Sequence, residues 1–384
     1  TKRMAERLAT IARSARPDSG HNNQETIDQI RSTLTQSQSD QQKSMLHQAL
    51  GYQLLIVGSV EEAIEEYKAA SEILSTLPGE SPKGAREKLR HNLGIAYLRL
   101  AEQDNCIAQH NCASCLAPIL PGTLGVHQIQ SGSRQALAEY SAALEAHPDD
   151  ASARWLLNIA SMTLGEYPDQ VPEQWRIPAA AFDSDVDFPR FYDVAPYLGL
   201  DMLGHAGGVV IEDFDHDGYL DIMVSSMGFT DQLRFFHNDG NGSFTDWTER
   251  AGLTGIVGGL NLCHADYDND GHPDVLVLRG AWLKSEGRIP NSLLRNNGNG
   301  TFEDVTEKAG LLSFRPTQTA AWADFDGDGW LDLFIGNESW PPDRTPCELY
   351  HNNRDGTFTE CSARLGLAVE GIVKGVIWGD FNND

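Results

Sequence analysis

The spacing of apolar residues divides this 384-residue chain into two parts with different periods. Up to about residue 166, apolar positions recur at the spacing of an amphipathic helix, and glycine is sparse. From Phe191 onward, short apolar runs alternate with turns rich in Gly, Asn and Asp, which is typical of β-strands. The stretch between them holds four prolines, which exclude a continuous helix. The pattern predicts a helical domain over residues 1–166, a proline-rich linker over 167–190 and an all-β domain over 191–384.

The helical part contains a pattern of small and large residues that occurs twice. The first copy begins at Gly51 and the second at Gly94. The matching positions that follow are Leu54, Ala63, Tyr67 and Ala70 in the first copy, and Tyr97, Ala136, Tyr140, Ala143 and Pro148 in the second. An insertion over residues 102–131 interrupts the second copy, and residues 153–168 form a further helical segment. We expect helix pairs that stack as repeats, with a generic helical bundle as the alternative.

An acidic string recurs in the β part, three times in full and once in part. The copies are DFDHDGYLD from Asp213, DYDNDGHPD from Asp266, DFDGDGWLD from Asp324 and DFNND from Asp380. A second string runs through Phe244, Phe302 and Phe358, and Phe191 occupies the same place in an earlier copy. Each of these phenylalanines lies 22 residues before the first Asp of an acidic string. One structural unit of 53 to 58 residues therefore repeats.

Each unit predicts four short strands: one before the acidic string, one after it, one that ends at an Asn-rich turn and one through the phenylalanine. The strands before the acidic strings are residues 208–212, 262–265, 319–323 and 376–379. Because a four-stranded sheet cannot bury both of its faces alone, we expect radial stacking as blades of a β-propeller. The chain opens with Thr1 and stops inside the fourth acidic string, so we expect further blades in a longer chain.

The full acidic strings have the spacing of a cation-binding loop. Carboxylates at positions 1, 3, 5 and 9 and a carbonyl at position 7 form an oxygen shell that suits Ca²⁺, and glycine at position 6 allows the bend. The expected ligands are Asp213, Asp215, Asp217, the Tyr219 carbonyl and Asp221; Asp266, Asp268, Asp270, the His272 carbonyl and Asp274; and Asp324, Asp326, Asp328, the Trp330 carbonyl and Asp332. The interrupted fourth loop offers Asp380, Asn382 and Asp384. Acidic turns without an ion are the alternative.

A helix–loop–helix calcium site is excluded, because its position 12 needs an acid and this chain has Val224, Val277 and Ile335 there.

These motifs resemble known repeats. The acidic strings and their strands resemble FG-GAP/VCBS repeats, the calcium-loop blades also found in integrin α-subunit propellers. The helical pattern resembles the tetratricopeptide repeat, whose period is about 34 residues. Their combination resembles bacterial members of the ASPIC/UnbV, cartilage-acidic-protein-like group. The resemblance implies an α plus all-β multidomain fold, in which tetratricopeptide-like helices precede an incomplete propeller with calcium loops.

The charge limits the possible partners. Asp and Glu number 55 against 29 Lys and Arg, and a net charge of −26 argues against nucleic acid. No apolar stretch approaches the roughly 18 to 20 residues that cross a bilayer. Calcium loops favour an extracellular, periplasmic or cell-surface location. Three bound Ca²⁺ ions would also offset about six of the excess negative charges.

The cysteines leave several readings open. The insertion holds Cys106, His110, Cys112, Cys115 and His127, which suit either a zinc or copper site or a disulfide such as Cys106 to Cys115. Covalent haem attachment is excluded because leucine follows the CxxC. Cys347 and Cys361 are equidistant from a predicted hairpin turn, so they either face each other across it or remain buried free thiols.

No catalytic motif is present: the chain has no nucleophile elbow, phosphate loop or HExxH string, and its Asp clusters are assigned as ligands. The leading hypothesis is a calcium-binding scaffold whose helical repeats contact proteins, with glycans as further partners. The rivals are a propeller enzyme, such as a polysaccharide lyase or hydrolase with its active site outside these residues, and a self-assembling filament subunit.

Overall fold

The structure is a computed structural model that describes residues 1–14, 24–37, 39–77, 84–108, 111, 117–186, 191–202, 204–281, 283–341 and 344–381. The chain forms two compact units. One unit is Gly20–Tyr197, and the other joins Thr1–Ser19 to Leu198–Asp384. We call them the helical unit and the sheet unit.

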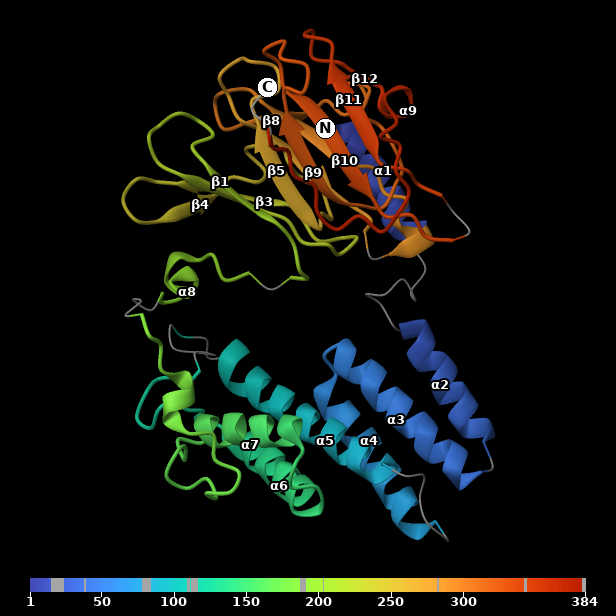
Figure 1. Ribbon diagram of the computed structural model, residues 1–384, viewed down its shortest axis with the longest axis vertical. Helices are drawn as coiled ribbons and strands as arrows, with labels where there is room; N and C mark the ends of the chain where they lie inside the picture. Colours follow the sequence, from blue (N-terminus) through green and yellow to red (C-terminus); the bar gives the residue numbers. More distant parts are fainter. Residues whose placement is uncertain are drawn as a thin grey trace. The chain divides into compact units, whose positions relative to one another are not determined.

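Helices build the helical unit (Figure 1). Its elements are α2 (Gln24–Gln36), α3 (Asp40–Ile56), α4 (Val60–Thr76), α5 (Ala85–Glu102), the π-helical turn η1 (Gln103–Ile107), α6 (Ser131–Ala146), α7 (Ala151–Thr163), the 3-10 turn η2 (Ala179–Phe182) and α8 (Ala195–Leu198). Two helices begin at residues that the sequence favours as caps. Ser39 Oγ accepts a bond from the third residue of α3, and Asp150 Oδ1 accepts one from Ala153 N at 2.9 Å at the start of α7.

The two expected glycine–tyrosine pairs each join two helices. A Cβ atom at Gly51 in α3 would lie 2.9 Å from the Tyr67 ring in α4, and one at Gly94 in α5 would lie 2.7 Å from the Tyr140 ring in α6. Both tyrosines are completely buried. Glycine therefore allows each tyrosine ring to lie directly against the neighbouring helix, and the second pair forms despite the insertion between its helices.

Asn105 closes the base of the insertion. Its side-chain nitrogen donates to the Ala101 and Ile129 carbonyls at 2.8 and 2.9 Å, and its oxygen accepts from Gln128 N and Ile129 N at 2.8 and 2.9 Å. One buried amide thus holds the two ends of the inserted segment together, which allows α5 and α6 to pair as neighbours.

Most of the expected linker packs against the helical unit. Tyr167 and Val171 are buried in its core, and Asn158 of α7 bonds to Trp175 O at 2.9 Å and to Ile177 N at 3.0 Å. The prolines exclude a long helix here, but they do not prevent apolar residues from packing. The first part of the expected proline-rich linker, residues 167–182, therefore packs as part of the helical unit.

Within its described residues, the sheet unit contains three antiparallel four-stranded sheets. Sheet 1 is β1 (Val209–Glu212), β2 (Asp221–Val224), β3 (Arg234–Asn238) and β4 (Phe244–Asp246); sheet 2 is β5 (Asn261–Ala265), β6 (Asp274–Leu278), β7 (Ser292–Asn296) and β8 (Phe302–Asp304); sheet 3 is β9 (Thr317–Ala323), β10 (Asp332–Asn337), β11 (Glu348–Asn352) and β12 (Phe358–Glu360). In each sheet the strands pair in chain order, as the repeat predicts. Two short elements, the 3-10 turn η3 (Lys284–Gly287) and helix α9 (Ser362–Leu365), complete the unit.

Sheet 2 buries both of its faces. Every residue of β6 is buried. Val275 and Val277 belong to a core shared with sheet 1, whereas Leu276 and Leu278 belong to a core shared with sheet 3. Because side chains alternate along a strand, one strand serves both cores. Stacking of sheets is therefore how these repeats bury their apolar residues, as expected.

Helix α1 (Lys2–Ser14) belongs to the sheet unit, which differs from the expected helical domain over residues 1–166. Met4 and Leu8 are buried in the core shared by sheets 1 and 2, and Arg3 forms an ion pair with Glu307 at 3.0 Å. The apolar spacing correctly predicts a helix but carries no information on which core that helix joins.

Two segments that the repeat pattern assigns to strands do not form strands in the structure. Residues 376–379 form no strand, although Trp378 Nε1 donates to Ala321 O at 3.2 Å alongside β9. Phe191 lies outside any strand and is 79% exposed. A strand needs a backbone partner, and none is seen for residues 376–379 among the described residues. The helices within the described ranges include none that is long and apolar enough to cross a membrane.

Candidate metal centres

The acidic strings form three equivalent loops, each joining the first strand of a sheet to the second. We call Asp213–Asp221 loop 1, Asp266–Asp274 loop 2 and Asp324–Asp332 loop 3. Left-handed backbone occurs at position 4, with φ of 60° at His216, 55° at Asn269 and 73° at Gly327, and again at the glycine of position 6. These two reversals fold nine residues into a compact loop and bring its carboxylates together.

The position-1 carboxylate organises the backbone of its own loop. In loop 1, Asp213 accepts bonds from Asp217 N at 3.1 Å and from Gly218 N at 3.0 Å. Asp266 and Asp324 accept the same two bonds in loops 2 and 3, at 2.8 to 3.0 Å. The position-1 acid therefore holds the backbone of positions 5 and 6 in each loop.

The position-9 carboxylate ties the loop to the third strand. Asp221 is completely buried and accepts bonds from Asn238 N at 2.8 Å and Phe214 N at 3.3 Å. Asp274 and Asp332 repeat this arrangement, with Asn296 N and Asn352 N each at 2.8 Å. In each sheet, the first Asn of the Asn-rich turn thus donates its backbone N–H to the position-9 carboxylate of the loop.

Position 3 carries buried oxygens without partners. Asp215 Oδ1 in loop 1 and Asp268 Oδ1 in loop 2 are buried and have no hydrogen-bond partner. Four groups of side chains bring their ligand atoms within 4.8 Å of one another: Asp215, Asp217 and His237; Asp266, Asp268 and Asp274; Asp324, Asp326 and Asp328; and Asp326, Asp332 and His351. A cation is the partner that such a convergence of carboxylates would satisfy.

The position-7 residues follow the glycine in each loop. Tyr219 N donates to Asp217 Oδ1 at 2.8 Å, His272 N to Asp270 Oδ1 at 2.9 Å, and Trp330 N to Asp328 Oδ1 at 2.8 Å. This bond leaves the second oxygen of each position-5 carboxylate available for another partner.

Burial raises the pKa of several loop carboxyls. Burial raises the pKa of Asp274 to about 8, and the charges of Asp268 and Asp270 add to this effect. Burial also raises the pKa of Asp221, Asp268 and Asp332. Without a cation these carboxyls hold protons more tightly than ordinary carboxyls, so a cation that binds at Asp274 would have to displace a proton at neutral pH.

A basic residue lies beside each loop, which the spacing of the acidic strings did not predict. His237 Nδ1 lies 3.1 Å from Asp221 Oδ1 and 3.5 Å from Asp215 Oδ2. His351 Nδ1 lies 3.1 Å from Asp332 and 3.4 Å from Asp326. Arg295 holds the corresponding position in sheet 2. The signal was present in the strings HNDG, RNNG and HNNR, where a basic residue always precedes the anchoring Asn.

Loop 3 differs from the others in its position-5 carboxylate. Arg354 Nε and Nη2 donate to Asp328 Oδ2 at 2.9 and 2.6 Å. These bonds lower the pKa of the Asp328 carboxyl. An arginine therefore pairs with this oxygen in loop 3, whereas its counterpart in loop 1, Asp217 Oδ2, lies 3.9 Å from His237 Nε2.

The three loops also contact one another. His216 Nε2 in loop 1 lies 2.8 Å from His272 Nδ1 in loop 2, and Asn269 Nδ2 in loop 2 donates to Gly329 O in loop 3 at 3.0 Å. Through these contacts, loops 1, 2 and 3 form a continuous row.

In the interrupted fourth loop, Asp380 is exposed, whereas Asn382 and Asp384 lie outside the described residues.

Among the cysteines, the insertion brings one cysteine and one histidine together. Cys106 Sγ lies 3.6 Å from His127 Nε2, and burial lowers the pKa of His127. His110, Cys112 and Cys115 lie outside the described residues. Cys347 and Cys361 are buried free thiols, which is the second of the two expected arrangements.

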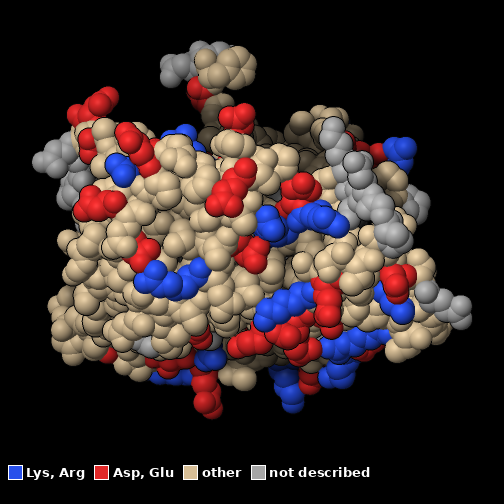
Figure 2. Space-filling model, turned by 90° about the horizontal axis from the view of Figure 1, so that it is seen from below, with Lys and Arg blue, Asp and Glu red and all other residues tan. Residues whose placement is uncertain are grey.

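The surface charge is mixed where Figure 2 displays it. Lys and Arg side chains lie among Asp and Glu side chains on that face, and large areas are uncharged. The net charge of −26 therefore does not gather into one acidic patch on the face shown.

Comparison with known proteins identifies the repeats. A family model described as an FG-GAP-like repeat matches residues 213–277 and 281–335, which contain the three loops. The chain is similar to cartilage acidic protein 1 from Mus musculus, with 26% identity over 241 residues, covering 61% of this chain and 35% of that protein. It is also similar to cartilage acidic protein 1 from Xenopus tropicalis, with 29% identity over 150 residues, 38% of this chain and 22% of that protein. The human protein of the same name is 26% identical over 211 residues, 50% of this chain and 31% of that protein. The chain thus spans about a third or less of these curated relatives.

Proposed function

Because this chain contains FG-GAP-like repeats and is related to cartilage acidic protein 1, we propose that it is part of an extracellular interaction protein whose sheet unit is held together by Ca²⁺. The observation that carries the proposal is the pair of buried, unpartnered carboxylate oxygens at Asp215 and Asp268, inside loops of equal geometry. A structural cation accounts for both features, whereas an acidic turn without an ion accounts for neither.

The donor set favours calcium over other metals. The loops supply carboxylate and carbonyl oxygens, which are the ligands of hard cations. Four carboxylates per loop and the flexible turn favour Ca²⁺ over Mg²⁺, which needs a stricter octahedron and retains more water. The bound ion would supply positive charge that offsets the repulsion between carboxylates and lets all of them remain ionised at neutral pH.

Bound calcium would stabilise each sheet and its neighbours together. The position-9 acid bonds to the third strand of its own sheet, and the Asn that anchors it also reaches the adjacent sheet. Asn296 Nδ2 donates to Phe214 O in loop 1 at 2.8 Å, and Asn352 Nδ2 donates to Tyr267 O in loop 2 at 2.9 Å. A cation that fixes one loop would therefore also strengthen the contact with the next sheet.

We further propose that the three sheets are blades of a propeller. Sheet 2 is covered on both faces, whereas sheet 1 leaves Val209 and Ile211 in β1 57% and 53% exposed. Repeats of this kind bury such faces by adding another sheet. The exposed face of β1 is where a further blade would pack.

The helical unit would provide contacts to protein partners through tetratricopeptide-like pairs. In support, α3 with α4 and α5 with α6 pair through the Gly–Tyr contacts, and α7 follows as a further helix. Three apolar residues of α3, Met45, Tyr52 and Ile56, are 64%, 55% and 49% exposed. Their spacing of seven and four residues places them on one face of the helix, where a protein partner would bind.

Calcium titration with site-directed variants tests the proposal. We expect calorimetry of the metal-free 384-residue chain to show about three Ca²⁺ sites, with Mg²⁺ a weaker competitor. Asp215→Asn and Asp268→Asn should each remove or strongly weaken one site, because asparagine keeps the shape but loses the charge. Asp239→Asn, in a turn outside the loops, is the control and should retain all sites. An unchanged stoichiometry in both loop variants, or no binding at millimolar Ca²⁺, would contradict the proposal.

A further inference from the structure

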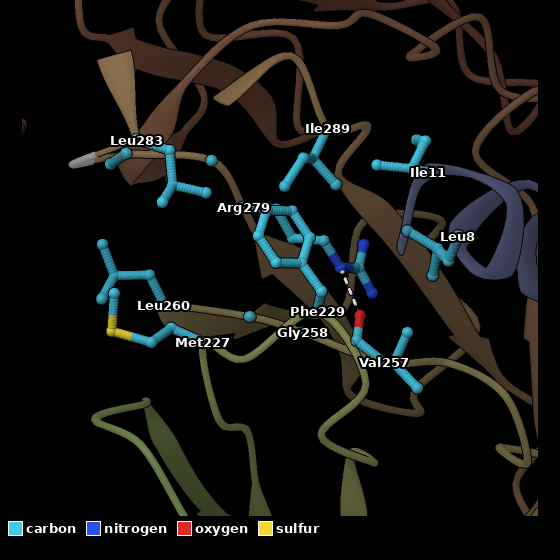
Figure 3. A pocket seen from close by; sticks show the side chains of 13 residues that line it. Leu8, Ile11, Met227, Phe229, Val257, Gly258, Leu260, Arg279, Leu283 and Ile289 are labelled. Atoms are coloured by element: carbon cyan, nitrogen blue, oxygen red, sulfur yellow. Dashed lines mark hydrogen bonds between the residues drawn. The ribbon is translucent and has the colours of Figure 1, made fainter. Parts of the chain in front are cut away.

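The sheet unit contains a buried arginine that is separate from the acidic loops. Arg279 follows β6 and is 2% exposed. It lines a cavity together with residues from α1, from the segments 227–229 and 257–260 and from the segment that leads to β7. Figure 3 shows its guanidinium group among the apolar side chains of Leu8, Ile11 and Val257.

Neutral groups satisfy only part of this guanidinium. Nε donates to Val257 O at 2.8 Å, and Nη1 donates to Pro290 O at 3.0 Å and to Ser292 Oγ at 2.8 Å. The remaining nitrogen, Nη2, is buried and has no hydrogen-bond partner. The three bonds fix the orientation of the group but provide no negative charge.

The positive charge remains on Arg279 despite its burial. Burial lowers its pKa to about 10, and the attraction of Asp304 only partly opposes this effect. The group is therefore protonated at neutral pH. Among the described residues, Arg279 has no ion pair with a carboxylate, and a buried charge of this kind is normally paired.

The cavity beside Arg279 is small and apolar. Its volume is about 20 Å³, and a single water molecule needs about 10–15 Å³. Of the thirteen described lining residues, Arg279 alone has a charged side chain, and the others are apolar or glycine. A buried water requires two to four polar partners, so the lining side chains suit a water molecule poorly.

We propose that this cavity is a binding site for a small monovalent anion, a halide or the carboxylate head of a molecule such as formate, held by Arg279 Nη2. A halide ion, which is a single atom, suits this space and satisfies the unpartnered nitrogen, whereas formate, with three non-hydrogen atoms, marks the upper limit of size. Either anion also neutralises the buried charge, which a water molecule does not do. Sulfate and phosphate, with four oxygens around a central atom, exceed the available volume.

The anion also has a structural consequence for α1. Leu8 and Ile11 of this helix line the cavity, so neutralising Arg279 stabilises the surface against which α1 packs. The site does not depend on calcium, because none of its lining residues belongs to an acidic loop.

Thermal unfolding of the full chain at saturating Ca²⁺ tests the site. Chloride or formate is raised at constant ionic strength, with gluconate, which is too large for the cavity, as the balancing anion. The sheet unit, followed by tryptophan fluorescence, should gain about 3–6 °C in Tm for each tenfold rise in anion above Kd. In Arg279→Met, which keeps an extended side chain without the charge, the gain should disappear. Arg234→Met is the control, because Arg234 is half-exposed and pairs with Asp246 at 3.0 Å; it should keep the gain.

Crystals grown in bromide provide a test that does not depend on a variant folding. An anomalous peak within about 3.5 Å of Arg279 Nη2 supports the proposal. A Tm gain with both anions assigns a general small-anion site, and a gain with formate alone assigns a carboxylate site. Equal gains in the wild-type chain and Arg279→Met, no gain with either anion, or a peak without any gain in Tm, which means an adventitious ion only, would each overturn it.

Discussion

The helical unit and the sheet unit differ in the kinds of polar side chain that they bury and in how these side chains find partners. In the helical unit, buried polar side chains bond to nearby backbone: Ser44 Oγ donates to Ala70 O at 3.1 Å, and Asn105 makes four bonds. In the sheet unit, the buried polar side chains include the ionisable groups Asp221, Asp274 and Arg279. Among the described residues, the Tyr140 hydroxyl is the buried polar side-chain atom of the helical unit that lacks a partner, whereas the sheet unit leaves atoms of ionisable groups without partners, among them Asp215 Oδ1, Asp268 Oδ1 and Arg279 Nη2. The comparison teaches that ionisable groups in a core are harder to satisfy from the chain itself than neutral ones.

Removal of calcium should produce the largest difference in thermal stability between the two units. If each of three sites contributes about 2.7 kcal/mol at a Ca²⁺ concentration of 100 times Kd, chelation should lower the Tm of the sheet unit by about 15–30 °C. The helical unit should be unaffected. Circular dichroism at 222 nm follows the helices, and fluorescence follows mainly the sheet unit, which holds six of the eight tryptophans.

The control for this experiment is chelation followed by restoration of Ca²⁺, with metal analysis to verify removal. Recovery of the fluorescence transition should be complete. An unchanged fluorescence midpoint in verified metal-free protein would rule out a structural role for calcium.

A substitution in the core of the helical unit should lower the stability of that unit alone. Gly94→Ala places a Cβ atom 2.7 Å from the Tyr140 ring, so the helices must move apart, which costs about 1–3 kcal/mol. We expect the transition at 222 nm to fall by about 2–12 °C and the fluorescence transition to remain. Lys88→Ala, an exposed position in the same helix, is the matched control. Equal losses in both transitions would show that the two units unfold together.

The pH dependence should also distinguish the units once calcium is removed. Burial raises the pKa of Asp274 to about 8 in the folded chain, so the folded state binds more protons than the unfolded state between about pH 4 and 8. The stability of the metal-free sheet unit, measured as Tm, should therefore fall as pH rises through this range. Saturating Ca²⁺ should reduce or reverse this slope. A metal-free Tm that rises from pH 5 to 8 would contradict the assignment.

The smallest expected effect concerns loop 3. Arg354 occupies Asp328 Oδ2, so Arg354→Gln should free that oxygen and tighten calcium binding at this loop by about two- to fivefold. Calorimetry of the metal-free chain measures the change. Arg364→Gln, an exposed arginine in α9, is the control. Weaker binding in Arg354→Gln would mean that the arginine supports the loop more than it competes with the cation.

Local regularities made much of the sheet unit predictable. The spacing of 22 residues from each phenylalanine to the next acidic string predicted four repeated units of short strands, the last one interrupted, and three of them form four-stranded sheets in the described residues. The loop positions followed from the same spacing, because a turn of nine residues brings its own acids together. Residues 376–379 show the limit, since their apolar pattern suits a strand but no described backbone pairs with them.

By itself, the sequence determined the periods: helical up to about residue 166, then a repeat of 53 to 58 residues with an acidic loop in each full copy. Only the tertiary structure decided that α1 packs with the sheets, that His237 lies beside loop 1 and that Arg279 is buried without a carboxylate. The physical reason is that periodicity records which face of an element is buried. It does not record which distant surface covers that face or which charges the covering brings together.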